Sequence, residues 1–248
     1  MTATGVFGVV VVVLVVVLMV ILTMLQRRSS FSFRKIPALP RLRRSVSLVV
    51  EDGTRLHVSL GRGSLLTPFG AAAYPGLGLL QKLGEVTSLS DRPPIATSGD
   101  AVLNLVAQDT LRTAHEAVAV DQGFDMNNGR LTGLTPFSFA AGVMPTIRDE
   151  AISTNVLIGN FGVEVGLLTE AAERQNASVI AASDNLPAQA VLYAVSTDPL
   201  IGEELFAAGA YTQAGDMHAA SLVAQDVLRW LVIGAIVVGA VLKAIGVL

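Results

Sequence analysis

Cysteine is absent from the chain, and histidine occurs only three times, at positions 57, 115 and 218. The lack of thiols excludes disulfides, thiolate zinc sites, iron–sulfur clusters and cysteine nucleophiles. The three histidines are far apart in sequence, and no G-x-S-x-G, H-E-x-x-H or Walker pattern is present. The sequence therefore indicates no catalytic residue, cofactor or metal ligand, and we expect a protein that is not an enzyme.

Charged residues are scarce, at 15% of the chain, and they are unevenly distributed. Seven of the 17 basic residues lie between positions 27 and 44, whereas residues 51–226 carry all 20 acids and eight bases. Such an acidic body repels the phosphates of nucleic acid, so we expect no nucleic-acid partner.

Two long apolar runs lie at the ends of the chain. Residues 5–25 carry no charge and form a helix of about 30 Å, which matches the hydrocarbon core of a bilayer. Residues 227–248 are long enough for a second span, which begins near Arg229 and Trp230. A cleaved signal peptide is the alternative for the first run, but residues 1–4 carry no side-chain charge and no A-x-A site follows. We therefore expect a retained anchor and a lipid bilayer as partner.

Basic residues beside a span stay on the cytoplasmic side, so we expect both termini outside and the middle of the chain in the cytoplasm. A stripe of small residues in the second span, with Gly5 and Gly8 as partners, is expected to pack against another helix. The stripe contains Ala235, Gly239 and Gly246. The residues expected at the membrane interface are Arg27, Arg28, Arg34, Lys35, Arg41, Arg43, Arg44, Arg229 and Trp230.

The sequence divides into four segments. We expect a first membrane helix at residues 1–26, a stiff basic linker at 27–44 and an acidic cytoplasmic domain at 45–215. A helix at 216–248 leads into the second span.

The middle segment predicts an α/β domain with a mixed sheet. Alternating apolar residues around Asp52-Gly53 predict an N-terminal β-hairpin at residues 46–60. Residues 136–145 and 153–162 are expected to form strands, and helices are expected at 97–118 and after Asp184 and Asp198. The glycine-rich apolar stretch 61–84 is expected to be covered by protein or to lie on lipid, and both alternatives stay open.

A β-α-β unit is predicted from the strands 155–159 and 178–182 and the helix 163–175 between them. A dinucleotide site needs glycines in the first turn and an acid after the second strand. Candidate cofactor-binding residues are Gly159, Gly162, Gly166 and Asp184. Their spacing is G-x-x-G-x-x-x-G, and Glu164 opposes a phosphate, so we favour glycines used for strand-to-helix packing.

Residues 93–112 and 183–213 resemble an uncharacterised family of bacterial two-helix membrane proteins of unknown function. The resemblance covers most of the middle segment. It implies a location in the bacterial inner membrane and contributes no catalytic residue.

Taken together, these patterns favour a non-enzymatic membrane scaffold that forms a homo-oligomer through its α/β domain and membrane helices. The alternative is a membrane-tethered protein that binds a nucleotide or small ligand at the β-α-β turn, residues 159–166.

Overall fold

The computed structural model describes residues 3–28, 33–67, 70–88, 90–118, 123–196, 199–211 and 216–245. The chain forms two compact units. One is an α/β domain, Lys35–Thr212, and the other combines Met1–Arg34 with Gln213–Leu248. Each is described by itself.

The α/β domain is built on six parallel strands in the order β3-β2-β1-β4-β5-β6. The prediction of an α/β fold is confirmed, but the prediction of a mixed sheet is wrong. A helix follows each strand and returns the chain to the end of the sheet where that strand began, so neighbouring strands run parallel. The strands are β1 (Arg55–Gly61), β2 (Ile95–Ser98), β3 (Gly129–Leu131), β4 (Ile152–Asn160), β5 (Ser178–Ser183) and β6 (Leu200–Ile201).

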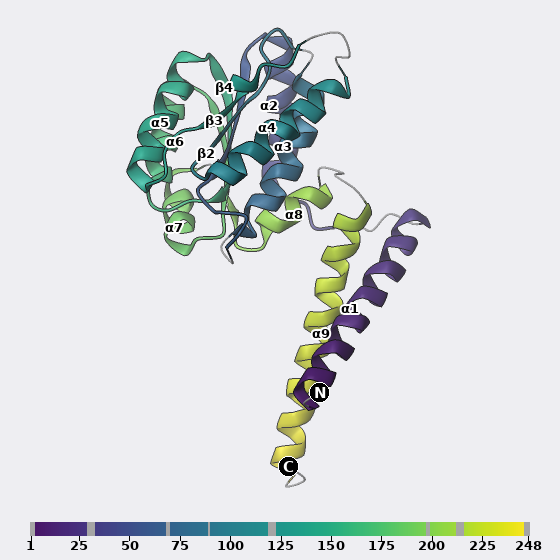
Figure 1. Ribbon diagram of the computed structural model, residues 1–248. Helices are drawn as coiled ribbons and strands as arrows, with labels where there is room; N and C mark the ends of the chain where they lie inside the picture. Colours follow the sequence, from purple (N-terminus) through teal and green to yellow (C-terminus); the bar gives the residue numbers. More distant parts are fainter. Residues whose placement is uncertain are drawn as a thin grey trace. The chain divides into compact units, whose positions relative to one another are not determined.

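Helices cover both faces of this sheet (Figure 1). On one face lie α2 (Ala38–Glu51), α3 (Ala73–Thr87) and α4 (Ala101–Glu116), and on the other lie α5 (Pro136–Asp149), α6 (Val165–Arg174) and α7 (Leu186–Val195). Helix α8 (Glu204–Tyr211) follows β6 and packs on α3, and a 3₁₀ turn spans Met126–Asn128. Burial of both faces explains why residues 155–159 read as an almost continuous apolar strand.

Residues 38–51, predicted as the end of the linker and the first strand of the hairpin, form helix α2 instead, whereas the second expected strand is observed as β1. The buried positions Leu39, Leu42, Val46 and Val49 recur at helical spacing and contact the domain. Leu48 and Val50, the alternate positions of the expected hairpin, are exposed. Asp52-Gly53 is the turn between α2 and β1, where Gly53 has a φ of +62°.

Residues 136–145, predicted as a strand, belong to α5. The Thr135 hydroxyl caps this helix and Pro136 lies in its first turn, two features that favour a helix start. The predicted helix at 97–118 is α4, although Thr97 lies in β2 and Asp100 alone caps the helix. The predicted β-α-β unit is confirmed as β4, α6 and β5.

The apolar stretch 61–84 contains the first part of α3, which packs on β1, β4 and α4. A Cβ on Gly76 would lie 2.8 Å from the carbonyl oxygen of Ile158, and one on Gly84 would lie 2.9 Å from the Cβ of Ala114. These glycines allow α3 to approach the sheet and its neighbouring helix closely. This side of α3 is therefore covered by protein, which is one of the two alternatives expected for residues 61–84.

The second unit contains two long helices, α1 (Ala3–Arg28) and α9 (Asp216–Ala244). By length and composition, Gly5–Arg27 and Met217–Ala244 are suited to cross a membrane. The two helices contact each other through Leu22, Ala220 and Ala224, with Leu18, Met19 and Val223 around them.

Substitution within α2 tests whether this helix belongs to the core of the domain. Leu42 is 1% exposed and Leu48 is 45% exposed on the same helix. We expect Leu42→Ala to lower the free energy of unfolding by about 3 kcal/mol, because it leaves a cavity. The matched variant Leu48→Ala is expected to change it by less than about 0.5 kcal/mol. Urea unfolding followed by circular dichroism measures both, and equal effects would contradict a packed α2.

Candidate functional site

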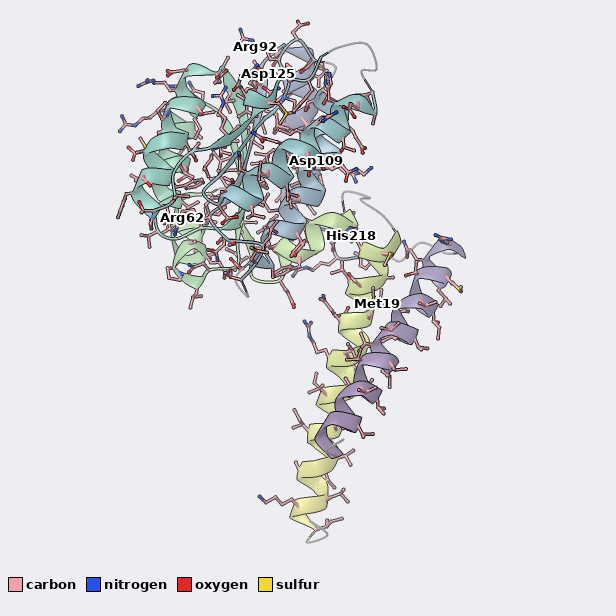
Figure 2. All side chains as sticks on the ribbon, in the orientation of Figure 1. Met19, Arg62, Arg92, Asp109, Asp125 and His218 are labelled. Carbon is pink, nitrogen blue, oxygen red and sulfur yellow. The ribbon has the colours of Figure 1, made fainter. Side chains whose placement is uncertain are left out.

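The sheet order reverses between β1 and β4. Strands β2 and β3 continue the sheet on one side of this pair, and β5 and β6 continue it on the other. In open parallel sheets, ligands bind beyond the carboxyl ends of the strands at such a reversal. Figure 2 shows Arg62, which follows β1, at one end of the domain and Arg92, which precedes β2, at the opposite end. The candidate site is therefore at the Arg62 end.

The backbones of β1 and β4 touch at this point. A Cβ on Gly61 would lie 2.2 Å from the carbonyl oxygen of Asn160, and one on Gly159 would lie 2.0 Å from the carbonyl oxygen of Leu60. Gly61 also has a φ of +71°, which favours glycine. The amide of Arg62 donates to Asn160 O at 2.8 Å, so pairing continues past the end of β1. The lack of a side chain at Gly159 thus allows the close contact between β4 and β1.

A buried carboxylate lies at the start of α6. Glu164 is 2% exposed, and its Oε1 accepts hydrogen bonds from Arg62 Nε at 3.0 Å and from the Gly162 amide at 2.9 Å. The first amides of a helix and a nearby arginine are the groups that would hold a phosphate in a dinucleotide site. Here Arg62 and an amide of the turn before α6 bind the chain's own carboxylate, so this arrangement disfavours a phosphate.

The remaining predicted cofactor residues also have local contacts. A Cβ on Gly162 would lie 2.4 Å from Glu164 Oε2, and one on Gly166 would lie 3.1 Å from Val191 on α7. Asp184 accepts a hydrogen bond from Asn160 Nδ2 at 2.8 Å. The structure brings Gly159, Gly162 and Asp184 to the same edge of the sheet, and Gly166 lies within the first turn of α6.

A second polar cluster lies inside the sheet, and the sequence analysis missed it. His57 on β1 is fully buried, with Nδ1 at 2.6 Å from Asn155 Oδ1 on β4 and Nε2 at 2.9 Å from Thr97 Oγ1 on β2. Thr97 in turn bonds Ser59 at 3.1 Å. Its signal in the sequence is polar residues inside otherwise apolar strands. Because no solvent reaches the imidazole, this cluster holds strands together and has no access to a substrate.

Burial lowers the pKa of His57 to about 4, against an ordinary value of 6.5. The hydrogen bond to Asn155 opposes this shift, and the positive charge of Arg130 adds to it. Arg130 belongs to a cluster in which Glu150 accepts hydrogen bonds from Arg130, at 2.6 Å, and from Arg55. His57 is therefore neutral in the folded domain at neutral pH.

A groove of about 510 Å³ lies between the outer sides of α5 and α6. Ala141, Met144, Pro145, Leu167 and Ala171 line its apolar part, and Arg148, Glu170, Arg174 and Gln175 line the rest. Beside it, Phe137 is 67% exposed and Val163 is 56% exposed. We name this region the α5–α6 face. The sequence does not predict this face, because the pattern of residues 136–145 predicts a strand and not the helix that lines the groove.

The residues expected at the membrane interface lie on three elements. Arg27 is exposed on α1, while Arg28 has no described side chain. Arg34, Lys35, Arg41, Arg43 and Arg44 are exposed before and along α2. Arg229, 3.6 Å from Asp226, and Trp230 are exposed on α9.

The expected helix-packing stripe is not the contact between α1 and α9. Ala235 is exposed, and a Cβ on Gly239 or on Gly8 would meet no atom within 4 Å. Gly246 lies outside the described residues. Ala235 and Gly239 of α9 are therefore open on the surface of this chain.

Among the described residues, no three histidine, aspartate or glutamate side chains lie close enough to hold a metal ion. The sequence profile described as "Domain of unknown function (DUF6754)" matches residues 2–248. Neither a curated protein nor a solved structure matches the chain.

The buried imidazole makes the stability of the domain depend on pH. In the unfolded chain His57 takes up a proton near pH 6.5, whereas in the folded domain it does so only near pH 4. Stability is thus fully present above pH 6.5 and falls between 6.5 and 4, by up to about 3 kcal/mol. Urea unfolding at a series of pH values measures this loss. His57→Gln is expected to flatten the profile, whereas His218→Gln on exposed α9 is expected to leave it unchanged.

Proposed function

The chain belongs to the DUF6754 family, whose function is unknown, and we propose that it is a non-enzymatic membrane-anchored scaffold that assembles into a homo-oligomer. The α5–α6 face carries this proposal, because it exposes apolar side chains around a groove on a folded domain. In this arrangement α1 and α9 span the membrane, and the α/β domain lies on the cytoplasmic side.

Membrane anchoring is supported by the two long apolar helices and by the charges beside them. Apart from the contact around Leu22, Ala220 and Ala224, the helices Gly5–Arg27 and Met217–Ala244 are largely exposed, and their exposed residues are mostly valine, leucine and isoleucine. Lipid is the environment in which such surfaces are stable. The basic residues between positions 27 and 44 support a cytoplasmic position of the domain, because basic residues beside a span stay on that side. A bacterial inner membrane is the location implied by the family resemblance.

The non-enzymatic part of the proposal is supported by the partners of the polar side chains. Glu164 is occupied by Arg62 and a backbone amide, and Asp184 by Asn160. His57 is buried inside the sheet. A catalytic group has to reach a substrate, and these three groups already serve the fold.

A second copy of the chain is the occupant we assign to the α5–α6 face. Its apolar side chains lie on one stripe of each helix, with Phe137 and Met144 on α5 and Leu167 on α6. At one end, Arg148 pairs with Asp149 at 2.7 Å and Arg174 with Glu170 at 2.6 Å. Because both signs of charge are present, a two-fold contact places acids of one copy opposite arginines of the other. The open small residues Ala235 and Gly239 allow close helix contacts in the membrane.

The test is the oligomeric state of the detergent-solubilised full chain. We expect Met144→Glu/Leu167→Glu to convert oligomer to smaller species, because each carboxylate would lose its hydration in the contact. Mass photometry measures the change, and we expect at least a tenfold rise in the concentration at which half of the protein is assembled.

The matched control is Val102→Glu/Leu105→Glu, which adds the same charge to exposed apolar positions of α4. This variant is expected to assemble as the unchanged chain does. A monomeric unchanged chain would refute the scaffold, and equal effects of the two double variants would move the contact away from the α5–α6 face.

A second candidate is a membrane-tethered protein that binds a small ligand, using Gly159, Gly162, Gly166 and Asp184. The reversal of strand order between β1 and β4 favours it. Glu164 disfavours the nucleotide form of this candidate, because its carboxylate repels phosphate.

Native mass spectrometry of the purified full chain tests the second candidate. It requires a small molecule that stays with the folded protein and is released on denaturation. Asp184→Asn would reduce the bound fraction, whereas Asp109→Asn, on exposed α4, would not. A chain that carries no bound molecule in this measurement leaves the scaffold as the favoured function.

A further inference from the structure

We propose that the basic outer side of α2 is a docking surface for anionic lipid headgroups, which holds the α/β domain against the membrane. The proposal rests on the membrane anchoring proposed above and adds a specific contact to it. The surface consists of Lys35 before the helix and of Arg41, Arg43 and Arg44 on it.

The apolar side of α2 is not available to lipid. Leu42 is 1% exposed and Val49 is not exposed at all, because they pack against the domain. A monotopic helix would insert this side among acyl chains, whereas the outward side of α2 carries its arginines and serines, with Leu48 and Val50 as the exposed apolar residues. The contact with a membrane is therefore mainly electrostatic.

The charge of this surface has one sign over a long stretch. No acidic residue occurs between positions 27 and 50, and Glu51 lies at the far end of α2. Glu173 is an acid close to this surface, since it lines a cavity together with Arg41. The other acids belong to a domain that is acidic overall. A strongly basic patch on an acidic domain suits a partner of high negative charge density, and a leaflet rich in anionic lipid has that property.

The same region of the domain is where both membrane helices join it. The chain enters the domain at Lys35, seven residues after α1 ends at Arg28. Seven residues reach at most about 25 Å, and the five residues from Tyr211 to Asp216 of α9 reach at most about 18 Å. Arg43 donates a hydrogen bond to Tyr211 O at 2.7 Å, which places the end of α8 beside α2.

These short connections keep the basic surface near the bilayer once α1 is inserted. Electrostatic attraction to a leaflet acts over roughly one Debye length, about 8 Å at physiological salt. Within that range each basic residue contributes about a fivefold preference for the docked state. We assign the partner as a lipid surface and not as a soluble anion, because the basic side chains are exposed along the outside of a helix. The cavity beside Arg41 also carries the carboxylate of Glu173, which repels a bound anion.

The test uses the full chain in lipid nanodiscs with a probe on α2. Because the chain lacks cysteine, Ser47→Cys on the exposed side of α2 provides a single labelling position for a fluorophore. Lipids with a quencher on the headgroup report its approach to the membrane. Thr113→Cys, exposed near the end of α4, is the reference position.

We expect quenching at position 47 in discs with an equal mixture of phosphatidylglycerol and phosphatidylcholine, and much less in phosphatidylcholine alone. High salt is expected to reverse it, which tests the proposal without any charge substitution. Arg41→Gln/Arg44→Gln is expected to lower the ratio of docked to undocked domain about 25-fold. Arg92→Gln/Arg112→Gln removes the same charge elsewhere on the domain and is expected to have no effect.

Quenching that is equal in both lipids and insensitive to salt would overturn the proposal. Added inorganic phosphate that abolishes quenching more strongly than sodium chloride of equal ionic strength would assign the patch to a soluble anion instead. A protein that alkaline carbonate extracts from membranes would refute the anchoring itself, so the two failures are distinguishable.

Discussion

The structure depends on the pairing of β1 with β4 at the centre of the sheet. These strands are far apart in sequence, and every other strand is added to the sheet on one side of this pair or the other. Two glycines at the carboxyl end allow the two backbones to touch, and the buried hydrogen bonds of His57 join β1 to β4 and β2 further back. Because a buried imidazole without partners would be unstable, this network also fixes which strands are neighbours.

The pairing of β1 with β4 also determines which groups lie at the point where the strand order reverses. Folds of this type leave a crevice there, into which the first helix amides point. In this chain the crevice end is occupied by the ion pair of Arg62 and Glu164, and Glu164 takes up an amide of the turn before α6. The groups that would recognise a ligand are used to close the fold. Exposed apolar side chains lie elsewhere, on the α5–α6 face, and exposed basic side chains lie along α2.

The sequence predicted the parts of the fold in which the pattern of apolar residues fits one type of secondary structure only. Residues 155–159 and 178–182 are apolar throughout and flank a helical pattern, so the β-α-β unit was recognised. The alternation of Val46, Leu48 and Val50 fits a strand, whereas the spacing of Val46 and Val49 fits a helix. Only the packing of Val46 and Val49 against the domain selects the helix. Strands β2 and β3 are too short to carry any periodicity. The His57 network was not predictable, because it depends on the register of three strands from distant segments.

The hydrogen bond from Arg43 to Tyr211 joins the beginning and the end of the α/β domain. A domain whose two ends are close together experiences a pull on its tethers only locally. Force that pulled these two ends apart would act first on this hydrogen bond. The strands of the central sheet would be loaded only after it has broken.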